Sequence, residues 1–440
     1  MEALRSRQLR SRVRRRRRSL CTAAAGAVAA LSLTACGVLP GTGEARELST
    51  LSSQALVDLS PIAESFNQWG PDHLLLETMA DDLLHERIRE ELAAESTSFD
   101  VVAVEGSWLA EFGEHLTPLD RLYTPEVRED LLPGALEEAE VDGDFVGMPV
   151  SVDSDVLYYR TDLFEDGSEQ AAFEERYGYP LSPPGNWEQY RDVAEFFTRD
   201  IDGDGQLDLY GTDLKGGVET DWLAAVSQAG AAALVVDGNG VVVNDAAHVA
   251  ALDFYAGLRR FAPPFAPTLD AAGARILFLQ GSLAMMRFSG SAYPDMPQNS
   301  PVTGKVGVAP MIAGPGGVAG VPRSVYLAVP EGSRNRGTGI DFLRHAFEHD
   351  GLLVGAPPRL PARISVVEAY ADREGFEHYA ALLTTLSSPA SRAAPAIPRW
   401  RQIADTVLLP VIQSALEGNR DTQALLDQAK AQIEAILAQP

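Results

Sequence analysis

Short runs of apolar, β-branched residues alternate with helical patterns along most of this chain, and this alternation limits the fold more than any other feature. Runs typical of buried strands cover residues 99–104, 156–159, 306–308 and 325–329. Helical patterns separate them over residues 187–198, 246–260 and 339–348. Strands that alternate with helices predict an α/β architecture with largely parallel sheets.

Three other segments have recognisable patterns. Apolar residues at helical spacing from Leu76 to Leu92 predict an amphipathic helix. Apolar runs flank Asp-Gly-Asn-Gly at residues 237–240, which predicts a tight hairpin because these residues tolerate positive φ. Residues 403–412 and 425–436 predict two C-terminal helices, separated by Gly418-Asn419.

The N-terminus has the pattern of an export signal. A basic head (14–18) precedes an apolar stretch (23–33) that is too short to span a bilayer, and Leu-Thr-Ala-Cys follows at residues 33–36. This ending resembles a bacterial lipobox, in which the cysteine receives a lipid. We therefore expect residues 1–35 to be a signal peptide with a lipobox and Cys36 to be the lipidation site. The alternatives are an ordinary signal peptide with an unrelated cysteine, or a membrane helix.

Charge and cysteine content narrow the functions of the mature chain. Residues 1–35 hold nine Arg and one Glu, a net charge of +8, so the remaining chain carries −34 of the total of −26. Such an acidic surface repels nucleic acids and anionic headgroups, so a lipid tether fits better than an electrostatic one. Cys21 and Cys36 are the only cysteines, which excludes a disulfide or a thiolate metal site in the mature chain. Residues 36–53 are rich in Gly, Ser and Thr and predict a flexible tether.

Several blocks in a fixed order resemble the extracellular solute-binding proteins of carbohydrate ABC importers, the family that includes maltose-binding protein. The blocks are residues 99–104, 108–112, 116–120, 145–150, 157–164, 278–286, 306–310, 314–317 and 395–400. The resemblance covers nearly all of residues 54–437. It implies a periplasmic-binding-protein-like type II α/β fold, with two α/β lobes joined by hinge crossings and a cleft between them. Mapped onto this chain, lobe one is 54–152 plus 309–350 and lobe two is 153–308 plus 351–440, with crossings near 150–153, 308–310 and 350.

The resemblance also implies a function. The protein is expected to capture a sugar or oligosaccharide outside the cell and to deliver it to the transmembrane subunits of an ABC permease. It is expected to be a monomer, held by the lipid on Cys36 at the extracellular face of the cytoplasmic membrane, with no required cofactor and no nucleic-acid partner. The alternatives are a binding protein for a polyol, a polyamine or another small solute, and a secreted glycosidase with paired carboxylates. The chain has no GxSxG, HExxH or P-loop motif, which disfavours an enzyme.

A sugar site needs acids or amides for hydroxyl groups and aromatic faces for the sugar ring. The predicted ligand-binding residues lie beyond strands, after crossings or in loops: Glu105, Ser107, Trp108, Asp153, Trp222, Tyr293, Arg323 and Trp400. For each aromatic residue the alternative is packing, and for each acid it is a solvated surface position. Arg323 has a further alternative, an ion pair with Asp153. Trp187 is assigned to packing.

A second motif suggests a structural calcium ion. Asp200, Asp202, Asp204, Gln206 and Asp208 fit the beginning of an EF-hand loop. Gly211 stands where the bidentate Glu belongs. The alternative is an Asp/Gly turn between a helix and a strand.

Overall fold

The computed structural model describes residues 45–54, 56–94, 97–238, 240–293, 297–354, 360–397, 399–418 and 421–439. Cys36, the predicted signal peptide and the first part of the predicted tether lie outside the described residues. Within the described part of the chain, no helix has the length and apolar character needed to cross a membrane.

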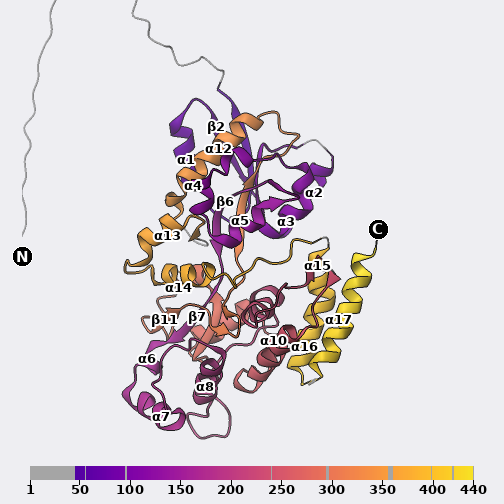
Figure 1. Ribbon diagram of the computed structural model, residues 1–440. Helices are drawn as coiled ribbons and strands as arrows, with labels where there is room; N and C mark the ends of the chain where they lie inside the picture. The colour runs from indigo at the N-terminus through magenta and orange to yellow at the C-terminus, as the bar shows by residue number, and fades with distance from the viewer. Residues whose placement is uncertain are drawn as a thin grey trace, which may run out of the picture. The chain divides into compact units, whose positions relative to one another are not determined.

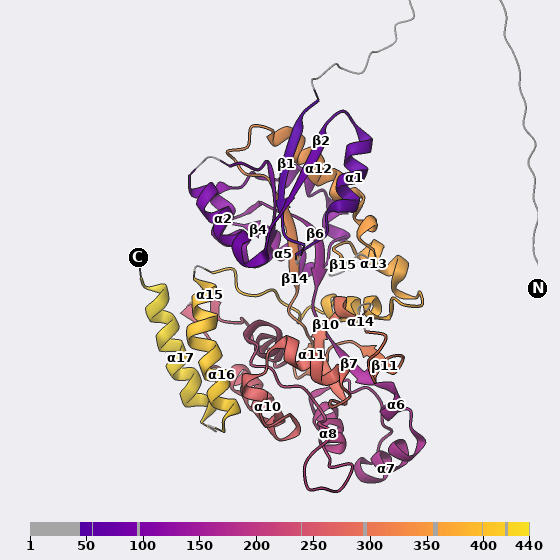
Figure 2. The same cartoon turned by 180° about the vertical axis from the view of Figure 1, so that it is seen from behind.

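A six-stranded sheet forms the first structural unit, which we call sheet A (Figures 1 and 2). Its strands, in spatial order, are β15 (Leu360–Pro361), β6 (Met148–Asp153), β14 (Arg323–Ala328), β3 (Val101–Glu105), β1 (Glu47–Ser52) and β2 (His73–Thr78). Strand β1 pairs in parallel with β2 and β3. Strand β14 runs antiparallel to both β3 and β6, and β15 runs antiparallel to β6.

The first strand corrects two sequence predictions. Composition predicts a flexible tether as far as residue 53, yet residues 47–52 form β1, with Leu48 and Leu51 fully buried. The strand was missed because buried Thr50 and Ser52 alternate with the leucines and dilute the apolar pattern. Leu76 lies in β2, so the helix predicted from this residue begins later, at Asp81.

A smaller sheet, sheet B, has the order β10 (Met285–Ser289), β7 (Asp155–Arg160) and β11 (Val306–Ala309). Both of its pairings are antiparallel. The prediction of largely parallel sheets was therefore wrong, although the predicted strands themselves are present. Strand β7 enters sheet B directly from β6, and β14 returns to sheet A, so the directions of these strands are set by the crossings and not by local helical connections.

The first crossing lies close to its predicted place, whereas the later ones lie further along the chain than predicted. Strand β6 ends at Asp153 and β7 begins at Asp155, close to the predicted first crossing. After β11, a hairpin of β12 (Ala313–Gly314) and β13 (Gly317–Val318) still contacts the helices around sheet B, since Ala313 bridges to Asn186. Strand β15 pairs with β6, so the chain remains in sheet A at Pro361, beyond the predicted boundary at 350.

Helices cover both sheets. Around sheet A lie α1 (Ser60–Trp69), α2 (Asp81–Ala93), α3 (Gly106–Phe112), α4 (Pro125–Glu129), α5 (Pro133–Ala139) and α12 (Arg336–Glu348). The other helices are α6 (Thr161–Phe164), α7 (Gly167–Tyr177), α8 (Trp187–Phe197), α9 (Ala224–Gln228), α10 (Ala246–Gly257), α11 (Ala271–Leu279), α13 (Ile364–Ala371), α14 (Glu377–Leu386), α15 (Trp400–Ile403), α16 (Leu409–Leu416) and α17 (Thr422–Leu437). Two short hairpins are also present. One pairs β4 (Glu140–Val141) with β5 (Asp144–Phe145), and the other pairs β8 (Val236–Asp237) with β9 (Gly240–Val241).

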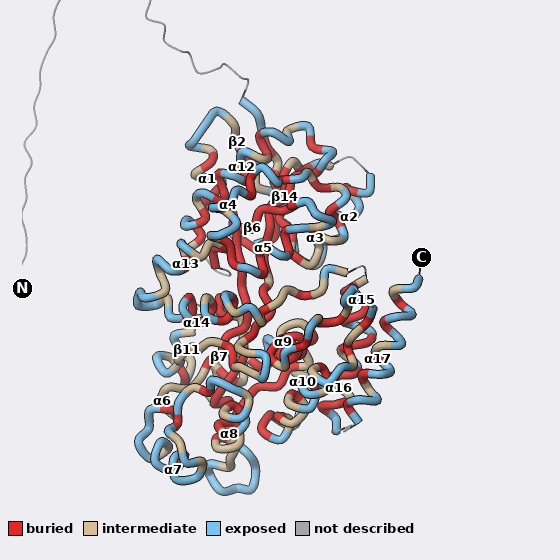
Figure 3. The backbone as a smooth tube through the Cα atoms, in the orientation of Figure 1, coloured by how far each residue is buried: buried red, intermediate tan, exposed pale blue. Residues whose placement is uncertain are grey.

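The buried apolar residues form a core at sheet A, a second large core beside sheet B, and a third cluster with residues from both sheets (buried segments are red in Figure 3). In the core at sheet A, the Phe66 ring of α1 meets the Phe342 ring of α12 edge-on, with the centroids 5.2 Å apart. In the other large core, Trp187 stacks on Phe254 at 4.2 Å, which confirms its assignment to packing. The third cluster contains Val152 of β6 and Val156 of β7, so apolar packing continues across the first crossing.

Candidate functional site

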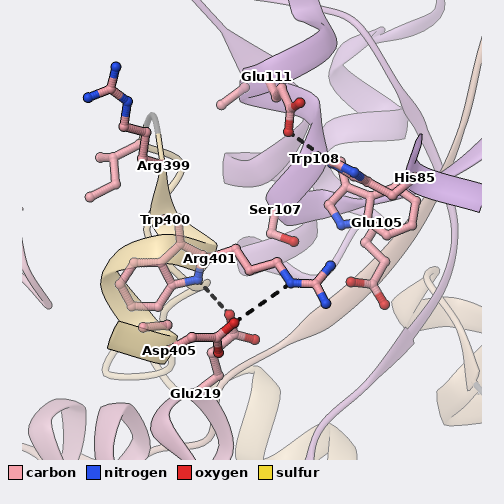
Figure 4. A pocket seen from close by; sticks show the side chains of 13 residues that line it. His85, Glu105, Ser107, Trp108, Glu111, Glu219, Arg399, Trp400, Arg401 and Asp405 are labelled. Atoms are coloured by element: carbon pink, nitrogen blue, oxygen red, sulfur yellow. Dashed lines mark hydrogen bonds and ion pairs between the residues drawn. The ribbon is translucent and has the colours of Figure 1, made fainter. Parts of the chain in front are cut away.

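A cavity of about 1050 Å³ lies between elements beside sheet A and elements beside sheet B (Figure 4). Residues near sheet A line one side of it, and residues near α15 and the turn before α9 line the other. The lining residues are His85, Glu105, Ser107, Trp108, Ala110, Glu111, Glu219, Ile397, Arg399, Trp400, Arg401, Ala404 and Asp405.

The first wall of the cavity is built where β3 ends and α3 begins. The buried run Val101–Val104 ends at Glu105, and Gly106 begins the helix that carries Ser107 and Trp108. A Cβ at Gly106 would lie 2.5 Å from the carboxylate of Glu138, so a larger residue here would have to displace that side chain. Three of the residues predicted to bind a ligand are thus neighbours on this wall.

His85 supports the Trp108 ring. Its imidazole meets Trp108 edge-on, with the centroids 4.9 Å apart and the planes at 76°. Nε2 of His85 lies 2.9 Å from Oε2 of Glu111 on α3. These contacts link α2 to α3 and hold the indole at the cavity.

The second wall of the cavity carries Trp400, at the beginning of α15. The residue is only 6% exposed, and its Nε1 donates a 2.5 Å hydrogen bond to Oε1 of Glu219. Glu219 comes from a π-helical turn, η3 (Val218–Leu223), far away in the sequence. A second π-helical turn, η8 (Ala404–Leu408), follows α15 and adds Asp405 to the lining. Turns of this kind are frequent at functional sites.

Charges of both signs lie at the edge of the second wall. Arg401 Nε is 3.8 Å from Asp405 Oδ2, and their side chains are 87% and 64% exposed. Because such an exposed pair is worth little energetically, both groups are free to rearrange around a bound molecule. Figure 4 shows Arg399 pointing away from the other labelled side chains.

A second cavity of about 740 Å³ shares Ile397 with the first. Helix α5 lines one side of it, and the segment around Pro389–Ile397 lines the other. Burial raises the pKa of Glu138, which lines this cavity, to about 8, so its carboxyl group is largely protonated at neutral pH. The Tyr326 hydroxyl donates a 3.1 Å hydrogen bond to Oε2 of Glu138.

Asp153 and Arg323 do not line either cavity. Arg323 Nη2 lies 3.1 Å from Asp153 Oδ2, and Nη1 lies 3.2 Å from Asp155 Oδ1. Asp153 is 4% exposed and also accepts hydrogen bonds from the Ser289 hydroxyl and the Ser291 amide. The pairing weighed as the alternative for Arg323 is therefore the one observed. It joins β14 of sheet A to the beginning of β7 in sheet B.

Two predicted aromatic residues also lie elsewhere. Trp222 is 1% exposed and belongs to the core around sheet B, because the helical turn directs its side chain inward together with Val218 and Leu223. Tyr293 lines a separate cavity of about 400 Å³ with Val302 and Val306. The structure therefore gathers four of the eight predicted residues in the large cavity: Glu105, Ser107, Trp108 and Trp400.

Four important residues of the cavity were missed from the sequence. Glu219, His85, Arg399 and Asp405 come from segments whose patterns predict only helices or loops. Glu219 had one usable signal, since it lies three residues before Trp222, a predicted ligand-binding residue. The positive φ of Arg399 (61°) has no sequence signal, because non-glycine residues adopt this conformation only where their surroundings enforce it.

The acidic loop forms a tight exposed turn. Both carboxylate oxygens of Asp200 accept backbone hydrogen bonds, from Gly203 at 2.6 Å and Gly205 at 2.7 Å. Ligand atoms of Asp200, Asp202 and Asp208 lie within 4.8 Å of one another. Asp204 Oδ1 instead accepts a hydrogen bond from the backbone N–H of Gln206, at 2.7 Å. The predicted calcium site thus has three converging carboxylates and lacks a closing Glu.

Comparisons with known proteins identify the class. The sequence profile described as bacterial extracellular solute-binding protein matches residues 80–351. A "Probable ABC transporter-binding protein" of Deinococcus radiodurans is 29% identical over 264 residues, which make up 58% of this chain and 60% of that protein. The chain therefore matches less than two thirds of that relative's length.

Two solved structures show the same fold. The sugar-binding protein MalE of Xanthomonas citri has a TM-score of 0.74 at 20% identity, covering 89% of this chain and 97% of that one. An ABC transporter solute-binding protein of Agrobacterium radiobacter, in complex with ribitol, has a TM-score of 0.68 at 22% identity, covering 89% and 98%.

The chain therefore has the fold of the type II periplasmic binding proteins. The chain belongs to the bacterial extracellular solute-binding protein family. This membership sets aside the glycosidase alternative, because the family consists of binding proteins and not of enzymes. The profile match includes Glu105, Trp108 and Glu219 but ends before Trp400.

Proposed function

We propose that this protein captures a sugar or oligosaccharide in the cavity between Trp108 and Trp400 and delivers it unchanged to the permease of an ABC importer. The observation that carries the proposal is the pair of indole side chains on opposite walls, with the carboxylate of Glu105 on the same wall as Trp108. Aromatic faces suit the apolar face of a sugar ring, and carboxylates accept hydrogen bonds from vicinal hydroxyl groups.

The charges of the cavity favour a neutral polyhydroxylated solute over a polyamine. Glu111 is engaged by His85, and Asp405 faces Arg401. Two of the four lining acids therefore have a basic neighbour, which makes the cavity less anionic than a site for a polycation would be. The volume of about 1050 Å³ is at the upper end for small-molecule sites, which leaves room for more than one sugar ring.

The solved relative that contains ribitol supports a polyol as the second candidate. A polyol has the same vicinal hydroxyl groups but lacks a rigid ring face. The dependence on the two indoles therefore separates the two candidates, because stacking contributes more to a cyclic sugar than to an open chain.

The site of action is part of the same proposal. A lipid on Cys36 would hold the chain at the extracellular face of the cytoplasmic membrane, as a monomer near its permease. The net charge of −34 beyond residue 35 supports a covalent anchor, since such a surface is repelled by anionic headgroups. Radiolabelled palmitate should enter the wild-type protein in cells and not a Cys36→Ala variant.

A thermal-shift screen against mono-, di- and oligosaccharides, polyols and polyamines tests the ligand assignment. A solute at 100 times its Kd should stabilise the protein by about 2.7 kcal/mol. The protein–solute mixture is then analysed by chromatography, and the solute should be recovered unchanged. Stabilisation by polyamines alone, or conversion of the solute, would contradict the proposal.

A further inference from the structure

We propose that Glu219 is a positioning residue that fixes the plane of the Trp400 indole for ligand stacking. This inference rests on the proposed function, since it assigns a role within the same cavity. The proposal also predicts a hydrogen bond between the Trp400 indole and Glu219 in the protein without a ligand. This bond can be measured whether or not a solute binds.

The contact between the two side chains is specific. The indole has one donor, Nε1–H, and it points to Oε1 of Glu219 at 2.5 Å. A bond to a carboxylate is about twice as strong as one between neutral groups. Because Trp400 is 6% exposed, water competes poorly for this donor. The bond therefore restricts rotation of the indole about its side-chain torsions.

The backbone of Trp400 is held separately. Arg399 precedes it with φ 61° and ψ 22°, a left-handed conformation that is costly for a residue with a Cβ. The Arg399 guanidinium donates to the Ile436 carbonyl of α17 at 2.8 Å and to Oε1 of Gln439 at 3.2 Å. The last helix thus sets where α15 begins, whereas Glu219 sets the orientation of the ring.

Glu219 itself stands on a fixed turn. Two residues further along η3, buried Asp221 lies 3.3 Å from Nη2 of Arg287 and 3.6 Å from Nζ of Lys215. Val218 and Trp222 on the same turn are in the apolar core. Because its neighbours are anchored on both sides, the backbone of Glu219 is held in place. The carboxylate that accepts the indole N–H therefore comes from a fixed backbone position.

The first test is the indole ¹H–¹⁵N NMR spectrum of the ligand-free protein, with the Trp400 signal assigned by its loss in Trp400→Phe. In Glu219→Ala this signal should move upfield and exchange faster with solvent. In Glu219→Gln, whose amide oxygen still accepts, most of the wild-type shift should return. Glu417→Ala, which removes an exposed carboxylate at the end of α16, should leave the signal unchanged. An unmoved signal in Glu219→Ala would overturn the proposal, whether or not any solute binds.

The second test is a double-mutant cycle with maltose and ribitol as probes. For a probe that binds the wild type, Glu219→Ala should weaken affinity about 10-fold, as loss of a charge-assisted bond predicts. In the Trp400→Phe background, which lacks the donor, the same change should cost less than about 2-fold. An equal loss in both backgrounds would show that Glu219 contacts the solute directly and would overturn the positioning role. If neither maltose nor ribitol binds the wild type, this result counts against the proposed ligand class. The NMR experiment then decides on its own whether Glu219 positions the indole.

Discussion

At the scale of single residues, the two indoles carry the account of the cavity. Trp108 rests on His85, and Trp400 is bonded to Glu219, so each ring is fixed before a solute arrives. Rings fixed in advance lose little conformational entropy when a solute binds, and this preorganisation increases affinity.

We expect Trp108→Ala and Trp400→Ala each to weaken sugar binding by about 30-fold or more, because buried aromatic anchors typically contribute 2 kcal/mol or more. Calorimetric titration measures the effect. Trp69→Ala is the matched control, since Trp69 is 64% exposed and does not line the cavity. Equal losses in all three variants would indicate general destabilisation and contradict the site.

Glu138 gives the stability a predictable pH dependence. Its pKa rises from 4.5 to about 8 because it is buried, so the folded protein retains a proton that the unfolded chain releases. This contribution to stability is complete below about pH 4.5 and is lost as the pH rises through about 8. Between pH 5 and 8, the free energy of unfolding of Glu138→Gln, measured with urea, should therefore rise relative to that of the wild type by about 1.4 kcal/mol per pH unit. A difference that stays constant with pH would contradict this.

The predictability of the site also differs residue by residue. Glu105, Ser107 and Trp108 could be predicted because residues beyond a buried strand face the sheet edge. Asp153 and Arg323 satisfy each other, and a one-dimensional pattern does not reveal which acid meets which base. Trp222 and Glu219 share one turn but face opposite ways, which depends on a π-helical geometry that the sequence does not specify.

At the scale of elements, β1 is the most informative correction. If residues 47–52 are a central strand and not a tether, Leu51→Ala should lower the free energy of unfolding by about 2–5 kcal/mol, because it opens a cavity beside fully buried neighbours. Leu75→Ala on β2, where Leu75 is 50% exposed, should cost less than about 0.5 kcal/mol. Urea titration measures both, and a neutral Leu51→Ala would restore the tether interpretation.

The acidic loop makes a separate prediction about metal binding. Three converging carboxylates without a closing Glu should bind calcium weakly, with a Kd of about 10⁻³ M or above. Calorimetry with CaCl₂ should show this weak binding in the wild type and none in the double variant Asp200→Asn, Asp208→Asn. Micromolar affinity, or binding that survives both substitutions, would contradict the loop as the site.

Strands with fully apolar runs, such as β3, β7 and β14, could be predicted because burial on both faces leaves a clear signal. Strand β15 has two residues, too few for any periodicity. Strand direction could not be predicted either, because it depends on where the chain crosses between the sheets.

At the scale of the whole molecule, two sheets, each packed against its own large core, are joined at Ser154 and by two return segments. The ion pairs of Arg323 with Asp153 and Asp155 lie across the first of these connections. Short connections between two stable bodies are where hinge closure takes place, so binding should change the distance between the bodies more than their internal structure.

Small-angle X-ray scattering with and without a saturating sugar tests most directly whether the solute is enclosed between the two bodies. The radius of gyration of the wild type should decrease on binding, and Trp400→Ala should show no decrease at the same sugar concentration. Saturable binding to the wild type with an unchanged scattering curve would contradict enclosure in the cavity between Trp108 and Trp400.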